Sequence, residues 1–340
     1  MKLIIKSSSR ALVSLSFILL AMLFVNISAF AQDEAEAPVK AKPVKNTFSS
    51  TWLIDNQTVM VPVQGTFQMD IQHRFGTFKT TKATRYGYND LFGLFAPSNI
   101  RMGFNYAPIK NLFVGFGMTK EKWLWDVNVK YAIIQQTPHK YPVSVSYYAN
   151  AALNSQKAND VFAPKSGYAL DKLIPAGKSL GSEGKFFRDR VSYFHQLLIA
   201  RKVTNALSVQ VAPSFSYQNA VAGFLTNPTT KTAIMKNGHF ALNAAAKYNV
   251  TESIAVMATY DQPLTKHPYF NPQPSLGFGI EMGTSGHAFQ LFVSNYSLLS
   301  PQRNSLYNQN IPFPYTNPTT KKTVDGGQWL IGFNITRLWN

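Results

Sequence analysis

Apolar and polar residues alternate with a period of two along most of the chain. In residues 123–133, WLWDVNVKYAI, large apolar side chains take every second position and Asp126, Asn128 and Lys130 lie between them. Successive side chains of a β-strand point to opposite faces, so this period predicts a strand with one apolar face. The pattern predicts twelve strands in all, the other eleven at residues 67–75, 100–106, 112–118, 143–151, 190–202, 207–217, 240–248, 254–260, 276–282, 289–293 and 329–339. In residues 190–202 both faces contain apolar residues, which leaves the register open.

The connections between these strands alternate in length. Short links at 108–110, 136–142, 203–206, 249–253 and 284–286 alternate with long ones at 77–98, 155–188, 220–237, 262–274 and 297–326, and the short link at 119–122 is the one exception. Outer-membrane barrels have short periplasmic turns and long outer loops. The sequence therefore predicts an all-β fold, a transmembrane antiparallel up-and-down β-barrel of about 12 strands with periplasmic N- and C-termini.

Aromatic residues mark both ends of the apolar face. The predicted aromatic girdle comprises Trp123, Tyr217, Tyr260 and Trp329 at the outer end and Tyr106, Tyr131, Tyr248 and Trp339 at the periplasmic end. Such girdles lie at the two membrane interfaces, so the apolar face should contact lipid. A secreted β-sandwich with a Phe-rich core is the alternative, but a sandwich explains neither the girdles nor the alternating loops.

The N-terminus has the features of an export signal. Three basic residues among the first ten precede residues 11–30, which carry no charge, and Ala29-Phe30-Ala31 is a small-x-small cleavage site. This pattern predicts a signal peptide over residues 1–31, cleaved after Ala31, although 20 uncharged residues could also form an uncleaved anchor. Residues 32–47, rich in Ala, Pro, Lys and Glu, predict a disordered spacer, and residues 48–340 the outer-membrane barrel.

The polar face of the strands defines the candidate functional residues. The predicted lumen-lining side chains are Asp70, Arg74, Arg101, Asn105, Asp126, Asn128, Lys130, Gln210, Lys247, Asp261 and Glu281. Because both charge signs occur, these residues could neutralise each other in a filled lumen, or they could form a charged constriction that selects solutes. Twelve strands lie between the filled eight-stranded barrel and the open sixteen-stranded channel. Residues 155–188 are long enough to fold inward as a plug.

Composition restricts the chemistry that the chain can perform. There are no cysteines, and the six histidines form no recognised metal-binding spacing, so we expect neither a metal nor a cofactor. His267, in a predicted outer loop, is a weak candidate for a lipid-modifying enzyme, and no catalytic residue is predicted. Three of the 17 net positive charges belong to the signal peptide, which leaves +14 for the mature chain. In an exported protein this excess favours contact with anionic outer-membrane lipids and lipopolysaccharide, and we expect no nucleic-acid partner.

Several segments resemble a family of β-barrel proteins of unknown function, DUF5777, which is found in Bacteroidetes-type bacteria. The segments are QTV at 57–59, IQHRFG at 71–76, SNIRMG at 98–103, LFVGFG at 112–117, LIARK at 198–202, GFGIE at 277–281 and GFNITR at 332–337. The resemblance covers about residues 50–340 and implies a barrel in the outer membrane. It implies no substrate and no catalytic residue.

The function predicted from these patterns is that of a porin-like passive conduit for an unidentified small solute. A closed structural or docking barrel and an outer-membrane lipid-modifying enzyme are the alternatives. The chain ends FNITRLWN, and an aromatic residue in a final amphipathic strand resembles the signal by which barrels are passed to the barrel assembly machinery, although Asn340 follows Trp339.

The cleavage site gives a direct test of export. We expect the mature protein to begin at Gln32 and to fractionate with the outer membrane, because Ala29-Phe30-Ala31 precedes an acidic, Pro-rich spacer. N-terminal sequencing of the protein from washed outer membranes measures this. An intact Met1, or recovery in the soluble periplasm, would contradict it.

Overall fold

The computed structural model describes residues 42–80, 91–161, 173–175, 187–227, 231–268, 271–316 and 321–340. The predicted signal peptide and most of the predicted spacer lie outside these residues. The wall strands are β3 (Phe67–Arg74), β5 (Asn99–Tyr106), β6 (Leu112–Thr119), β7 (Leu124–Ile134), β8 (Ser144–Asn154), β10 (Val191–Lys202), β11 (Leu207–Gln218), β14 (Gly238–Asn249), β15 (Ile254–Pro263), β16 (Ser275–Gly283), β17 (His287–Ser294) and β20 (Gln328–Trp339).

Shorter elements lie inside the wall or beyond its rim. They are β1 (Trp52–Leu53), β2 (Asn56–Gln57), β4 (Phe78–Lys79), β9 (Leu173–Pro175), β12 (Ala220–Asn227), β13 (Lys231–Ile234), β18 (Tyr315–Thr316), β19 (Thr323–Val324), α3 (Ala158–Val161), α4 (Pro301–Tyr307) and the 3₁₀ turns η2 (Glu121–Trp123) and η3 (Arg188–Arg190). Among the described residues, no helix is both long and apolar enough to cross a membrane.

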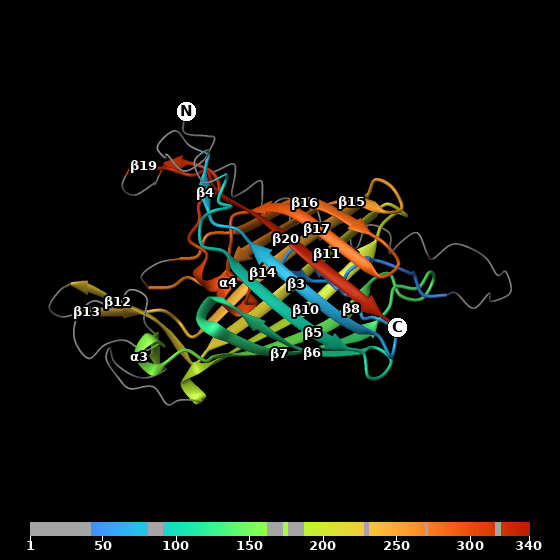
Figure 1. Ribbon diagram of the computed structural model, residues 1–340, viewed down its shortest axis with the longest axis horizontal. Helices are drawn as coiled ribbons and strands as arrows, with labels where there is room; N and C mark the ends of the chain where they lie inside the picture. The colour runs from blue at the N-terminus through green and yellow to red at the C-terminus, as the bar shows by residue number, and fades with distance from the viewer. Residues whose placement is uncertain are drawn as a thin grey trace.

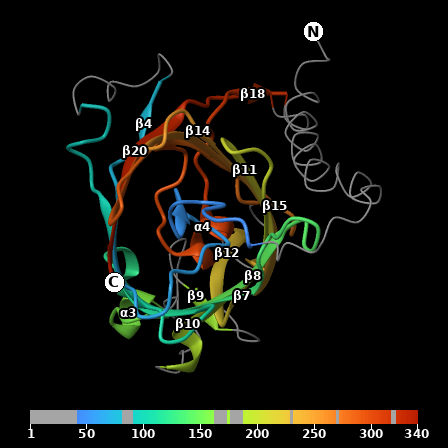
Figure 2. The same cartoon turned by 90° about the vertical axis from the view of Figure 1, so that its right-hand side faces the viewer.

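The twelve wall strands form one closed antiparallel sheet. Each strand from β3 to β17 pairs with the next wall strand along the chain, and β20 pairs with both β17 and β3, which closes the ring. The strands run obliquely to the long axis in Figure 1, and the ring is seen end-on in Figure 2. Closure satisfies the backbone hydrogen bonds of every wall strand without leaving a sheet edge, which a bilayer requires. The predicted all-β, antiparallel up-and-down barrel and its twelve strands are confirmed, while the periplasmic position of the termini stays a prediction.

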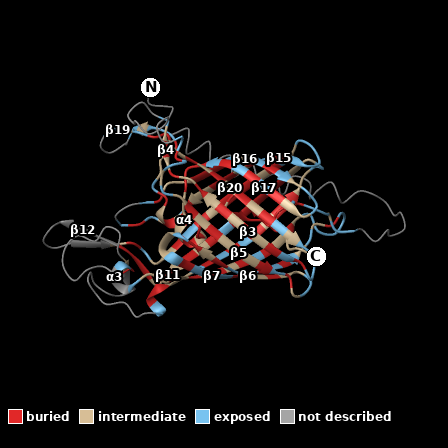
Figure 3. Cartoon of the chain, in the orientation of Figure 1, coloured by how far each residue is buried: buried red, intermediate tan, exposed pale blue. Residues whose placement is uncertain are grey.

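The two faces of the wall differ as the alternation predicts. Along β7, exposed Trp125, Val127 and Val129 alternate with buried Asp126 and Asn128. Figure 3 shows the same alternation as buried and more exposed bands across the wall. Large apolar side chains therefore cover the outside of the barrel, and polar side chains face its interior.

The ends of the barrel are distinguished by their connections. The turns that follow β5, β7, β10, β14 and β16 lie at one end, called here the short-turn end, together with the C-terminus (Figure 1). The other end, called here the long-loop end, carries α3, α4, β12 and β13. The β10 register that the sequence left open is now defined, because Tyr193, His195 and Leu197 point outward and Phe194 and Gln196 are buried inside.

The assignment of the faces can be tested by placing an arginine on the outward face of the wall and, separately, in an exposed turn. Val129→Arg puts a guanidinium in the middle of the outward apolar face, where it should cost roughly 2–4 kcal/mol. Val250→Arg, in the exposed β14–β15 turn, is the matched control and should cost little. The measurement is the yield of heat-modifiable folded barrel on gels. Equal yields from the two variants would mean that the faces are assigned wrongly.

Candidate functional site

The inner wall places all eleven predicted lumen residues inside the barrel. Ten of them are buried, and Arg74, Lys130 and Gln210 expose none of their surface. Asp261 is half-buried and accepts hydrogen bonds from Asn243 and Asn56. An open channel would leave such side chains in contact with water. Their burial means that other parts of the chain fill the lumen.

Residues 48–60, called here the plug segment, occupy the interior of the ring. The chain enters from the short-turn end, where the Val44 amide donates to the Gln136 carbonyl oxygen in the β7–β8 turn (2.7 Å). Inside the barrel, β1 and β2 form a small hairpin, which lies in the centre of the ring in Figure 2. These residues fall within the predicted barrel domain, but they fill the lumen and do not contribute a wall strand.

The apolar residues of the plug segment form the core of the lumen. Phe48, Leu53, Ile54 and Val59 are buried. They cluster with inward-facing wall side chains, namely Tyr148, Phe194, Leu198, Ala200, Ala212, Ala245, Met257 and Phe292, and with Tyr296. Ile54 reaches the wall at Gly277 on β16, where an added Cβ would lie 2.8 Å from its terminal methyl group.

Two wall glutamines bind the backbone of the plug segment. Gln210 accepts from the Val59 amide (3.1 Å) and donates to the Gln57 carbonyl oxygen (2.7 Å). Gln290 likewise accepts from the Ile54 amide (3.1 Å) and donates to the Trp52 carbonyl oxygen (2.8 Å). An amide side chain has both a donor and an acceptor, so each glutamine pairs the plug backbone as a neighbouring strand would.

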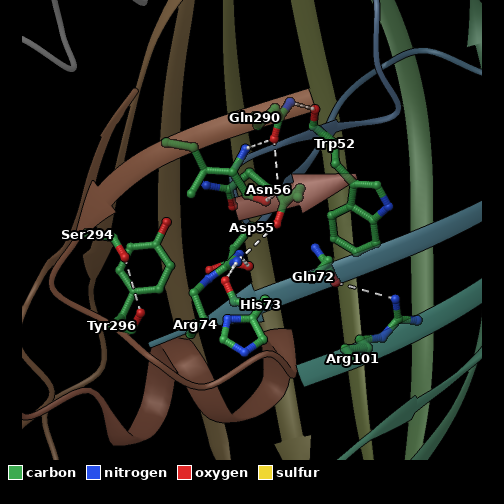
Figure 4. A network of polar contacts seen from close by, with 12 residues as sticks. Trp52, Asp55, Asn56, Gln72, His73, Arg74, Arg101, Gln290, Ser294 and Tyr296 are labelled. Atoms are coloured by element: carbon green, nitrogen blue, oxygen red, sulfur yellow. Dashed lines mark hydrogen bonds and ion pairs between the residues drawn. The ribbon is translucent and has the colours of Figure 1, made fainter. Parts of the chain in front are cut away.

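Charged wall residues hold the hairpin at its turn and at the two residues that flank its strands. The Arg74 guanidinium, which is fully buried, forms an ion pair with Asp55 (Figure 4). It also lies 4.4 Å from the centre of the Phe292 ring. On the other side of the hairpin, Lys130 Nζ donates to the carbonyl oxygens of Thr51 (3.4 Å) and Thr58 (3.1 Å).

The carboxylate of Asp70 binds the plug segment and, within the described part of the chain, has no cationic partner of its own. It accepts hydrogen bonds from the Trp52 indole (3.1 Å) and from three wall side chains, Gln68, Asn105 and Thr336. Four neutral donors can stabilise a buried carboxylate, because hydrogen bonds to a charged acceptor are stronger than neutral ones.

Two further ion pairs connect wall strands to each other. Arg101 on β5 donates to both oxygens of Asp126 on β7 (2.7 and 2.9 Å), and Lys247 pairs with Glu281. The Arg101–Asp126 pair crosses β6 at Gly117, where a Cβ would lie 2.2 Å from the guanidinium, so only glycine leaves room for it. Four of the inward charges therefore neutralise each other in pairs, and the plug segment supplies the partner of Arg74.

The long-loop end is closed by residues 295–311, called here the cap, which contain α4. Gln302 donates to the Asn150 side-chain oxygen (2.6 Å), and Arg303 forms an ion pair with Glu121 at the rim (3.0 Å). Figure 2 shows α4 inside the outline of the ring, behind the hairpin. A cavity of about 30 Å³ lies between the hairpin and α4. The interior is thus filled from both ends.

The segment at residues 155–188, whose inward folding the sequence left open, falls mostly outside the described residues. The described parts are 155–161, 173–175 and 187–188, of which β9 pairs with β12 at the long-loop end. The segments that do fill the lumen are the plug segment and the cap.

The predicted girdle residues lie on the outward side of the wall, with one difference in exposure. Trp123, Tyr106, Tyr131, Tyr248 and Trp339 are exposed, and Tyr217 and Trp329 are half-buried. Tyr260 exposes only 8% of its surface, and its hydroxyl donates to Gln262 on the same strand.

His267 is not positioned as a catalytic group. It is buried, its Nδ1 accepts from the Lys236 amide (3.2 Å) and its Nε2 lies 3.0 Å from His239 Nδ1. Burial, and secondarily the charge of Lys236, lower the pKa of His267 below its ordinary value. Both ring nitrogens are therefore engaged within the fold. In the described part of the chain, no group of three or more His, Cys, Asp or Glu side chains is arranged to hold a metal ion.

The sequence contained a signal for the plug segment that strand periodicity does not reveal. Trp52, Leu53 and Ile54 form an apolar run without alternation, just after the predicted spacer. Apolar residues also interrupt the polar face of several wall strands, as Phe194 and Leu198 do on β10 and Phe292 does on β17. An apolar run that precedes the wall, together with apolar residues on the polar face of the wall, indicates that the run packs against those wall residues.

Comparison with known proteins identifies a family. A family model described as "Membrane bound beta barrel domain (DUF5777)" matches residues 48–339. No curated protein sequence matches the chain.

Three similar solved structures are remote in sequence. The NanC porin is 8% identical, with a TM-score of 0.44 over 80% of this chain and 100% of that one. The COG4313 outer membrane channel of Pseudomonas putida F1 is 8% identical, with a TM-score of 0.40 over 82% and 97%. A mutant of TodX, described as a monoaromatic hydrocarbon channel, is 8% identical, with a TM-score of 0.36 over 83% and 92%.

The Arg101–Asp126 pair allows a test of how the filled lumen is stabilised. Asp126→Ala leaves a buried guanidinium without its carboxylate, which should destabilise the barrel by roughly 3–5 kcal/mol. The double variant Arg101→Met/Asp126→Ala should recover much of that loss, because no buried charge then remains unpaired. Urea unfolding of the refolded barrel measures both, with Asp325→Ala, in an exposed segment, as the control. Additive effects of the two substitutions would contradict the pairing.

Proposed function

We propose that this chain, which belongs to the DUF5777 family of membrane-bound β-barrel domains, is an outer-membrane channel that its own plug segment closes at rest. In this proposal, a small solute passes when the plug segment leaves the lumen. The proposal keeps the porin-like conduit expected from the sequence and adds a gate, the plug segment.

One observation carries the proposal: the plug segment fills the lumen without taking part in the wall. The closed ring of wall strands contains none of its residues, and β1 and β2 pair only with each other, over two residue pairs. Its polar contacts are made by side chains of the wall, including Arg74, Lys130, Gln210 and Gln290. Withdrawal towards the short-turn end would therefore break no ladder of the barrel.

Water or a polar solute could replace the contacts that withdrawal breaks. Hydrogen bonds exchanged for bonds to water contribute only about 0.5–1.5 kcal/mol each. Once the plug segment has left, the inner wall would offer Arg74, without Asp55, and Lys130 to a solute. The cap would have to shift as well, and its rim contact through Arg303 and Glu121 is an ion pair only partly buried from water.

The proposed location and orientation follow from the same features. The short-turn end, where the plug segment enters and the chain terminates, would face the periplasm, and the basic outer loops would face lipopolysaccharide. The C-terminal strand β20 closes the ring between β17 and β3, which supports a role for FNITRLWN in recognition by the barrel assembly machinery. Export by the predicted signal peptide is part of this proposal.

A closed structural or docking barrel is the second candidate. It is favoured by the close approach of the two filling segments, since the plug segment and the cap meet with a cavity of only about 30 Å³ between them. A lipid-modifying enzyme has less support, because His267 is buried with both ring nitrogens engaged.

Conductance in planar bilayers separates the two candidates. The wild-type barrel should show only rare openings. Asp55→Asn, which weakens the ion pair with Arg74, should open more often, and deletion of residues 48–60 should give continuous current. Asp325→Asn, in an exposed segment, is the matched control and should behave as wild type.

The folded state of every variant is verified by heat modifiability before recording. A reversal potential in a salt gradient should then show weak anion preference for the deletion variant, because Arg74 has lost Asp55. A deletion variant that is folded but carries no current would favour the closed docking barrel. An unrestricted current through the wild type would rule out closure by the plug segment.

A further inference from the structure

The cavity between the hairpin and α4 is lined by all three parts of the molecule. The plug segment contributes Asp55 and Asn56, the wall contributes Phe194, Gln196, Ser214, Ala241 and Asp261, and the cap contributes residues 298–301, Asn304 and Ser305. Its volume of about 30 Å³ exceeds the 10–15 Å³ that one water molecule needs. The polar residues around it converge from segments that are distant in the sequence.

Two of these residues have a buried oxygen with no hydrogen-bond partner among the residues that the structure describes. They are Asp55, whose Oδ1 binds Arg74 while Oδ2 has no partner, and Asn304, whose Oδ1 has none. Asn304 exposes only 6% of its surface, and the Asp55 side chain 9%. A buried acceptor without a donor is costly, and in native proteins it usually has a partner such as water or an ion.

The other groups around the cavity also offer oxygen. Ser214 donates its hydroxyl to the Ala241 carbonyl oxygen, and Ser300 donates to Gln302, so both retain lone pairs for an incoming group. Asp261 accepts from Asn243 and Asn56 and retains capacity on its carboxylate. Carboxylate, amide and hydroxyl oxygens together form the ligand set of hard cations, of which Ca²⁺ accepts the most irregular geometry.

The local charge also favours a cation. Asp55 and Asp261 line the cavity as carboxylates, while the charged partner of the pair is Arg74 alone, bound to Asp55. The carboxyl group of Asp261 thus has no ion-pair partner among the described residues. Bringing a second carboxylate there is unfavourable without a further positive charge.

We propose that this cavity binds a hard cation, best matched by Ca²⁺, through Asp55, Asp261 and the amide oxygen of Asn304. The cation completes its coordination with serine hydroxyls and an enclosed water molecule. It joins the plug segment, the wall and the cap at one point, so it stabilises the closed arrangement. This site does not depend on whether the barrel conducts.

The test uses the full-length folded barrel, stripped with a chelator and then titrated with CaCl₂. Wild type should bind about one Ca²⁺ per chain by calorimetry and unfold roughly 5 °C higher at saturation. Asn304→Ala should lose most of this shift. Asn304→Asp should unfold at lower temperature than wild type without Ca²⁺ and recover with it, because a third carboxylate needs the cation.

Asn128→Ala is the matched control, because Asn128 is a buried wall amide that binds Asn105 away from the cavity. It should keep the full Ca²⁺ response. If Asn304→Asp fails to refold without Ca²⁺, refolding yield against Ca²⁺ concentration replaces the melting temperature as the readout. An absent Ca²⁺ response in wild type, or equal responses in wild type and Asn304→Ala, would mean that the cavity holds only water and would overturn the proposal.

Discussion

The polar inner face of the wall is the constraint on which the rest of this structure depends. Because side chains alternate, strands that present apolar residues to lipid also point polar residues into the barrel. Wall side chains alone fill a barrel of eight strands, but a ring of twelve strands is wider. Every buried donor, acceptor and charge on that face needs a partner, since an unsatisfied group costs about 1–3 kcal/mol. Here the partners come from the N-terminal plug segment and from the cap, which enter from opposite ends.

The plug segment meets this requirement in two ways at once. Its backbone amides and carbonyl groups satisfy Gln210, Gln290 and Lys130, while its apolar side chains cover the apolar positions of β10, β15 and β17. The fit is specific at Gly277 of the wall, which makes space for Ile54 where a larger residue would collide. A filling that is this specific in shape, yet separate from the wall ladder, suits a removable closure better than a permanent core.

The need of every buried polar group for a partner also distinguishes the junction between the plug segment and the cap. Most polar groups of the described interior find protein partners, and two of the exceptions, Asp55 and Asn304, line the same cavity. A single bound cation there would act on both closures together. Stability and gating would then be coupled through the ionic conditions, without any change in the wall.

The sequence by itself determined the wall. Strand periodicity is local, so the twelve strands, their faces, the inward charges and the ends marked by loop length could all be predicted from neighbouring residues. The tertiary structure alone decided what fills the lumen, because Asp55 meets Arg74, Ile54 meets Gly277 and Gln302 meets Asn150 across separations that no local period encodes. The β10 register was ambiguous for the same reason: its inner face packs against the apolar plug, so both of its faces are apolar. A local pattern shows which side chains point inward, whereas their partners are fixed only when the chain closes around its own N-terminal segment.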